Sequence, residues 1–120
     1  ERRVKHCALR DVAGMLRSLD YARHTALHQT AQGAIELERL APAARRWERV
    51  VRRAFLQAYR EVVVDGGLWA DEAAFDRSAA LLELFELEKA LYELRYELDN
   101  RPDWVGVPLA GIAALAGITH

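Results

Sequence analysis

Hydrophobic residues recur every three or four positions along most of the chain, which is the spacing of one buried helix face. The first such stretch runs from Asp11, a residue suited to an N-cap or first turn, to about His28. Its apolar positions are Val12, Met15, Leu16, Leu19, Ala22 and Ala26. Residues 1–9 lack this periodicity and are predicted to form an extended lead-in.

A second helix is expected to begin at Pro42, because proline is favoured in the first helical turn. It should end near Asp65-Gly66-Gly67, which is a turn signal. Its predicted inner stripe consists of Trp47, Val50, Val51, Ala54, Ala58 and Val62. Residues 29–40 are ambiguous and include a stretch that can form a short helix after Gly33.

A third, long helix is predicted to start among Asp71, Glu72 and Asp76, because carboxylates complement the positive end of the helix dipole. The pattern allows a break at 76–78 and continues to about Asn100. Pro102 then ends the helix, because it disfavours the α conformation of the preceding residue.

Pro108 suits the start of a last short helix over "LAGIAALAG". No segment alternates between apolar and polar residues as a half-buried strand would. The chain is therefore predicted to be an all-α bundle of about four to five helices that forms a single helical domain, residues 1–120.

The stretch "ALYELRYELDNRPDW", residues 90–104, has two non-random sides. At about 100° per residue, one side is a leucine seam within about 80° of arc, and it is the expected core face. Its members are Leu84, Leu87, Leu91, Leu94 and Leu98. Phe85, Tyr92 and Tyr96 fall on nearly the opposite side. The simpler interpretation is a helix buried on both sides, and the alternative is a surface that binds a sugar through aromatic and polar groups.

Charge is distributed unevenly, although the net charge of the 120 residues is only −1. Residues 1–60 carry 13 Lys and Arg against 6 Asp and Glu, and residues 61–120 carry 4 against 12. The favoured interpretation is that basic and acidic helices lie against each other, and the alternative is a pair of separate binding surfaces. The length and composition fit one globular domain, and no apolar run is long enough to cross a bilayer.

The sequence gives weaker support to three other kinds of site: a metal site, a reactive thiol and a nucleic-acid-binding surface. His24 and His28 have the i, i+4 spacing of helical zinc ligands, but no third ligand is evident, so an exposed pair is favoured. Cys7 is the only cysteine and lacks a catalytic context, which excludes an internal disulfide and weakly favours an intracellular protein. Six arginines between residues 45 and 60 suggest nucleic-acid binding, but the acidic second half argues against it.

Two motifs, "LRDVAGMLRSLDYA" (9–22) and "FELEKALYELRYELDNRPDWVGVPLAGI" (85–112), resemble the C-terminal part of bacterial maltokinases, which also occur fused to trehalose synthase. The resemblance covers most of the chain, although residues 27–70 match only in helical character. It implies the helical end of the C-terminal lobe of a kinase related to aminoglycoside phosphotransferases. Such an enzyme transfers phosphate from ATP to maltose, giving maltose 1-phosphate for α-glucan (glycogen) synthesis in the cytoplasm.

The family's catalytic aspartate and magnesium motif lie upstream of the "DVAGMLRS" helix, so these 120 residues are expected to be a fragment of a larger kinase that is inactive alone. ATP and Mg²⁺ would belong to the parent enzyme, and no cofactor, metal or catalytic residue is expected here. Asp11 is expected to be a structural cap. The resemblance leaves open whether the parent is a free kinase or a trehalose synthase fusion.

Acceptor helices of such kinases face the cleft, so the resemblance implies that Tyr92 and Tyr96 line a maltose site and that Trp104 stacks on a glucose ring. Glu93, Asn100 and Arg101 are further candidates for contacts with sugar hydroxyls. The expected partners are maltose, the remainder of the kinase and trehalose synthase, with no nucleic acid or membrane. The alternative function is a stand-alone helical interaction module that pairs with trehalose synthase.

Overall fold

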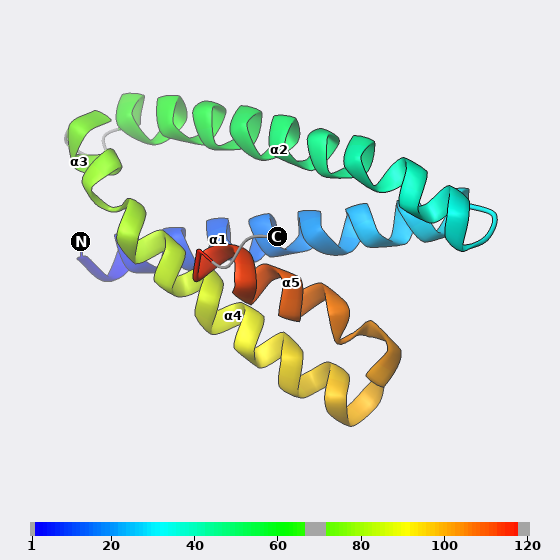
Figure 1. Cartoon of the computed structure of the whole chain (residues 1–120). Coiled ribbons are helices and arrows are strands. Elements are labelled where there is room, and N and C mark those ends of the chain that lie inside the picture. The colour runs from blue at the N-terminus through cyan, green and yellow to red at the C-terminus, as the bar shows by residue number, and fades with distance from the viewer. Residues whose placement is uncertain (1, 67–71, 118–120) are drawn as a thin grey trace.

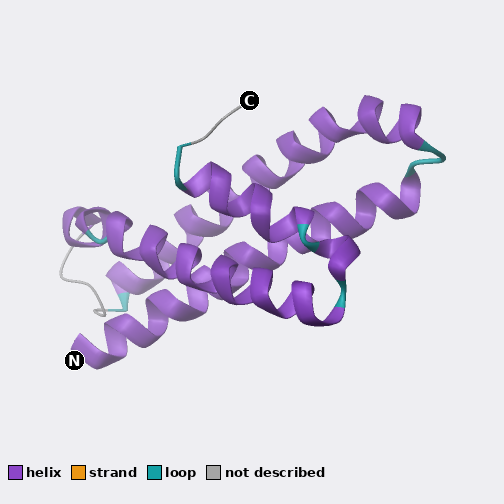
Figure 2. Cartoon of the chain, turned by 60° about the horizontal axis from the view of Figure 1, so that its bottom comes forward, coloured by secondary structure: helices purple, strands orange, loops and turns teal. Residues whose placement is uncertain are grey.

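The computed structural model describes residues 2–66 and 72–117, and in this part of the chain the regular structure is entirely helical (Figure 2). The elements are α1 (Arg2–Thr30), α2 (Ala34–Asp65), α3 (Glu72–Arg77), α4 (Ala79–Asn100), a 3-10 turn (Pro102–Trp104) and α5 (Gly106–Leu115). The predicted all-α bundle is therefore confirmed. None of the described helices combines the length and apolar character needed to cross a bilayer.

Helix α1 is the central helix of the bundle, because α2, α4 and α5 all contact it. Gly33, with φ of 94°, lies in the turn that sends α2 back along α1, and α5 folds back along α4 (Figure 1). No close backbone contact joins α2 to α4 within the described residues. The two helices thus both lie on α1, and side chains such as Arg52 and Glu86 make the direct contacts between them.

The core forms where α1 meets α2 and α4. Its buried residues are Leu9, Val12, Ala13, Leu16, Val63, Leu82 and Phe85. Leu9 is completely buried, one turn before Val12, so the apolar stripe of α1 extends further toward the N-terminus than the sequence suggested. The predicted extended lead-in over 1–9 is accordingly wrong for residues 2–9, which are helical, and residue 1 lies outside the described residues.

Helix α2 also starts earlier than predicted. It is continuous from Ala34, so Pro42 lies inside the helix and the expectation that it occupies the first turn is wrong. Proline cannot donate a hydrogen bond to the carbonyl of Glu38, but Glu38 is exposed, so water can bond that carbonyl instead. The turn at Gly66 follows where expected, and the proposed helix start at Asp71 lies outside the described residues.

The predicted inner stripe of α2 is largely wrong, because it faces outward. Trp47, Val50 and Val62 are 45%, 61% and 69% exposed, and Ala54 and Ala58 are also exposed. The core is reached instead by residues on another side of the helix, among them Phe55, Leu56, Tyr59 and Val63. Two apolar stripes run along this helix, and periodicity alone does not show which of them is buried.

The break near Asp76 is confirmed at Ser78, between α3 and α4, but the predicted core face of α4 is wrong. Leu84, Leu91 and Leu98 are more than half exposed, while Leu87 and Leu94 are half-buried. The buried positions of α4 are Leu82, Phe85, Glu86, Ala90 and Glu97. These positions also recur at helical spacing, and they are stable in the interior because basic or phenolic partners from other elements satisfy both glutamates.

The uneven charge of the two halves is matched inside the bundle, as favoured from the sequence. Among the described residues, four ion pairs join the basic half to the acidic half: Arg10–Glu88, Arg17–Glu93, Arg52–Glu86 and Arg60–Asp76. Arg17 is 4% exposed, and its guanidinium bonds both Glu93 oxygens and also pairs with Asp20. The pairs therefore connect α1 and α2 to the acidic helices α3 and α4.

Candidate functional site

The most concentrated group of aromatic and charged side chains lies where α4 ends. Pro102 stops α4, and the following 3-10 turn places Trp104 against α1. The Trp104 ring is nearly parallel to the Tyr21 ring, at 6.1 Å between centroids and an interplanar angle of 13°. On the next turn of α1, the His24 ring lies 4.8 Å from Trp104, tilted by 51°. The indole is thus held in one orientation by two rings of α1.

Arg101 covers Trp104, with its guanidinium carbon 4.2 Å from the ring centroid. The same guanidinium donates two hydrogen bonds to the Glu97 carboxylate, at 2.9 and 2.7 Å. Glu97, which is buried, also accepts a 2.7 Å hydrogen bond from the Tyr21 hydroxyl. We call Tyr21, His24, Glu97, Arg101 and Trp104 the Trp104 cluster.

The electrostatics of the cluster follow from these contacts. The Arg101 guanidinium, together with the Tyr21 hydroxyl, holds the pKa of the Glu97 carboxyl below its ordinary value. Burial and the hydrogen bond to Glu97 raise the pKa of Tyr21, so its hydroxyl stays protonated and remains a donor. Burial and the nearby charges of His28, Arg23 and Arg101 lower the pKa of His24, which favours the neutral imidazole.

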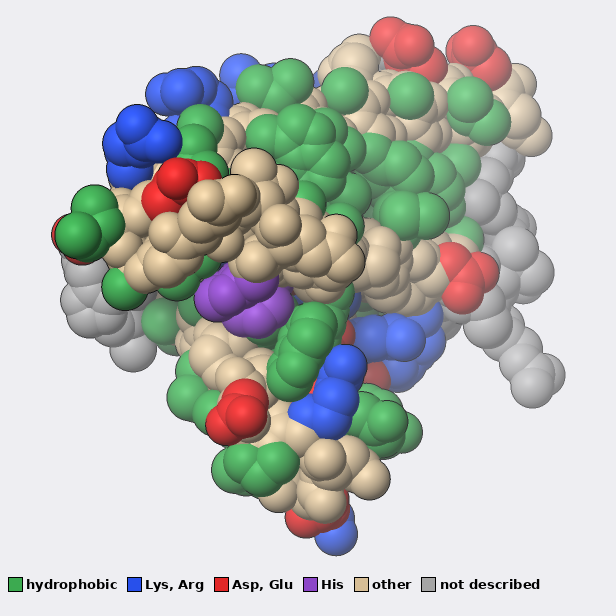
Figure 3. Space-filling model, turned by 90° about the vertical axis from the view of Figure 1, so that its right-hand side faces the viewer, with side chains coloured by type: hydrophobic (Ala, Val, Ile, Leu, Met, Phe, Trp, Pro, Cys, Tyr) green, Lys and Arg blue, Asp and Glu red, His purple; other side chains and the backbone are tan. Residues whose placement is uncertain are grey.

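A hollow of about 420 Å³ opens beside the cluster. It is lined by His24, Thr25, His28, Gln29, Asp103 and Trp104. The histidine side chains are visible at the surface in Figure 3, next to hydrophobic and basic side chains. The His24 and His28 rings lie 4.2 Å apart. The wall thus combines flat aromatic surfaces with hydroxyl, amide, imidazole and carboxylate groups, which is the composition of a site for a small polar ligand.

The six residues predicted from the sequence to bind sugar do not all lie at the hollow. Trp104 lines the hollow, and Arg101 lies over the Trp104 ring without lining the hollow itself. Tyr92 and Tyr96 are 73% and 48% exposed on the surface of α4, where no described side chain covers them fully. Glu93 is bonded to Arg17, and the Asn100 amide donates to the backbone carbonyl of Tyr96 at 2.9 Å. The structure therefore brings Arg101 and Trp104 together and places the other four outside the hollow.

Sequence reasoning missed Tyr21 as a member of the site and treated His24 and His28 only as a metal pair. The available signal was their spacing, since positions 21, 24 and 28 are three and four residues apart and share one side of a helix. Within the described residues, no three His, Cys, Asp or Glu side chains come together as a metal site. The side chain of Cys7 lies outside the described residues.

The arrangement provides groups that can bind a small polar molecule. Aromatic faces, a protonated phenol, a neutral imidazole and a fixed guanidinium can hold a polyhydroxylated molecule. No family model matches the sequence, and no solved structure matches the chain.

Proposed function

We propose that the chain is the acceptor-binding helical part of a maltokinase, in which it holds maltose for phosphorylation by ATP to maltose 1-phosphate. The observation that carries this proposal is the fixed orientation of Trp104 at the mouth of a hollow lined by polar groups. In this proposal a sugar ring packs its C–H face against the part of the indole that lines the hollow, while Asp103, Gln29 and the imidazoles accept and donate hydrogen bonds to its hydroxyls.

Tyr92 and Tyr96 extend the proposed acceptor surface along α4. They are exposed and lie one helical turn apart on α4, and Tyr96 precedes Arg101 by five positions. A two-ring saccharide needs more than one aromatic platform, because each ring presents its own C–H face. We therefore assign Trp104 to one glucose unit and the tyrosine pair to the other.

The chain's role in the reaction is to orient the acceptor, and positioning is a large part of phosphoryl-transfer catalysis. ATP would supply the phosphoryl group, and Mg²⁺ would neutralise its charge, in the remainder of the kinase. The proposed setting is the cytoplasm, where ATP is available, with trehalose synthase as a fused or separate partner. By itself the chain should form no maltose 1-phosphate.

Titration of the 120-residue chain with maltose, followed by NMR, tests the proposal. Trp104→Ala and the double change Tyr92→Ala/Tyr96→Ala should each weaken maltose binding by about tenfold, as expected for a lost stacking platform. Trp47→Ala is the matched control, because Trp47 is an exposed tryptophan on α2 and should not affect binding. If maltose shifts no signal of the cluster, or if Trp47→Ala has the same effect as Trp104→Ala, the acceptor site is refuted.

A second candidate is a helical interaction module, and the exposed stripe of α2 favours it. Trp47, Val50 and Val62 form an apolar surface that no described residue covers fully. Mixing the chain with trehalose synthase should then shift its elution in gel filtration, and Trp47→Asp/Val50→Asp should abolish the shift. An unchanged elution of the mixture would exclude this pairing.

A further inference from the structure

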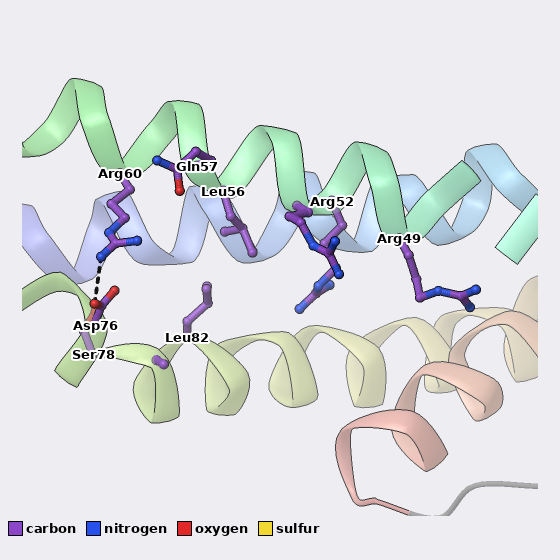
Figure 4. Close-up of a pocket in the computed structure, with 10 residues that line it drawn as sticks. Arg49, Arg52, Leu56, Gln57, Arg60, Asp76, Ser78 and Leu82 are labelled. Atoms are coloured by element: carbon purple, nitrogen blue, oxygen red, sulfur yellow. Dashed lines mark hydrogen bonds and ion pairs between the residues drawn. The ribbon is translucent and has the colours of Figure 1, made fainter. Parts of the chain in front are cut away.

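A second and larger cavity lies between α2 and the start of α4, with a volume of about 680 Å³ (Figure 4). It exists because α2 and α4 both pack on α1 but do not pack backbone to backbone on each other. Arg49, Arg52, Arg53 and Arg60 line it from α2. The other lining residues are Leu56, Gln57, Asp76, Ser78, Ala79 and Leu82. It shares no lining residue with the hollow beside Trp104.

Two of the four arginines are neutralised by carboxylates. The Arg52 guanidinium forms a two-pronged pair with Glu86, at 2.8 Å for each contact, and Glu86 is 2% exposed. Arg60 pairs with Asp76 at 2.8 Å, as the dashed line in Figure 4 marks. These two pairs hold α2 at a fixed separation from α3 and α4 and keep the cavity open.

Arg49 and Arg53 remain without a counter-ion. In the part of the chain that the structure describes, neither guanidinium forms an ion pair or a hydrogen bond with another side chain. They lie one helical turn apart on the cavity side of α2. Figure 4 shows Arg49 and Arg52 reaching from α2 toward the space above α4. Two unpaired guanidinium groups at one cavity create a local positive potential.

The floor of the cavity is apolar, since Leu56 and Leu82 approach each other there from α2 and α4 (Figure 4). The ligand chemistry follows from this combination. Guanidinium groups bind phosphate through paired N–H donors, and leucine side chains accept the C–H surface of a carbon skeleton. The volume is well above that of a lone phosphate and lies in the range of small-molecule sites.

We propose that this cavity binds a phosphorylated small molecule, with its phosphate on Arg49 and Arg53 and its carbon skeleton on Leu56 and Leu82. The inference does not depend on the proposed function, because it uses a different cavity and a different ligand chemistry. Free phosphate and a phosphate monoester share the anionic group, so the test must separate these two sources.

The test is an NMR titration of the ¹⁵N-labelled chain at constant ionic strength with three probes: inorganic phosphate, glucose 1-phosphate and uncharged glucose. The arginine side-chain N–H signals report directly on the proposed contacts. Either phosphate should shift the signals of Arg49 and Arg53, and glucose should leave them unchanged. Tighter binding of glucose 1-phosphate identifies a monoester as the ligand, and equal binding identifies free phosphate; both outcomes support the anion site.

The variant Arg49→Ala/Arg53→Ala should weaken phosphate binding by about tenfold or more, because both unpaired guanidinium groups are removed. Arg46→Ala/Arg95→Ala is the matched control: it removes the same charge from exposed positions that do not line the cavity, and it should change the affinity by less than about threefold. Equal losses in the two variants would show attraction by net charge alone and overturn the proposal. Absence of binding by both phosphates, or binding of an oligonucleotide only, would also overturn it.

Discussion

The Tyr21 hydroxyl on α1 donates a 2.7 Å hydrogen bond to the Glu97 carboxylate on α4, across 76 positions of sequence. The Tyr21 ring at the same time stacks on Trp104. One side chain therefore supports both a buried carboxylate and the aromatic wall of the candidate site.

Tyr21→Phe should reduce the free energy of unfolding by about 1–2 kcal/mol, because it removes a hydrogen bond to a charged group and leaves the ring in place. Glu97 retains its two bonds from Arg101, so the fold should persist. Urea denaturation measures the change. Tyr92→Phe is the control, since the side chain of Tyr92 is 73% exposed, and it should be neutral. Equal stability of the two variants would contradict a structural role for the Tyr21 hydroxyl.

Glu48 should make stability depend on pH. Burial and a hydrogen bond with Asp20 raise the pKa of Glu48 from 4.5 to about 7, and they outweigh the opposite effect of its ion pair with Arg23. Between these values the folded chain binds more protons than the unfolded chain, so the free energy of unfolding should fall as pH rises from 4.5 to 7. Glu48→Gln should remove this dependence, so its free energy of unfolding relative to that of the unaltered chain should rise by about 1 kcal/mol between pH 5 and pH 7.5.

Urea denaturation at both pH values gives the free energy of unfolding of the variant and of the unaltered chain. The difference between the two chains isolates the effect of Glu48, because other groups such as His24 titrate equally in both. Glu83→Gln is the matched control, because Glu83 is exposed on α4. A Glu48→Gln effect that is the same at both pH values would show that protonation of Glu48 is not responsible.

Gly111 should resist substitution because a methyl group there would meet Arg17. A Cβ atom at Gly111 would lie 2.9 Å from both Cζ and Nη2 of Arg17, whose guanidinium is buried and held by Asp20 and Glu93. Gly111→Ala should therefore destabilise by about 1–3 kcal/mol, despite the helix preference of alanine. Gly106→Ala on the same helix places its Cβ in open space and should be neutral or stabilising. Thermal unfolding compares the two, and equal midpoints would refute the clash.

The features that the sequence predicted correctly depend on local chemistry. Pro102 ends α4, and the break at Ser78 lies within the stretch 76–78 where the pattern allowed one. The matching of basic with acidic helices was also expected from charge alone. The helix end and the break depend on residues next to them in the sequence, and the matching of helices follows from how charge is distributed along the chain.

Burial on α2 and α4 was mispredicted because both helices have more than one apolar stripe. Leu91 is exposed while Glu97 is buried, and that burial is stable because Tyr21 from α1 and Arg101, just past the end of α4, both bond the carboxylate. Hydrophobic periodicity cannot indicate such pairing, because it contains no information about other elements. The Trp104 cluster was found only in part for the same reason: Tyr21 joins it through the packing of α1 on α4.

The central place of α1 has a consequence for how the protein is made. Its contacts with α2, α4 and α5 mean that the surface on which the rest of the bundle assembles is synthesised before those three helices. Until α4 emerges, Leu9, Val12 and Leu16 lack part of their cover, so the nascent chain displays an uncovered apolar ridge. In the finished protein the same ridge should hold the amide protons that exchange most slowly with solvent.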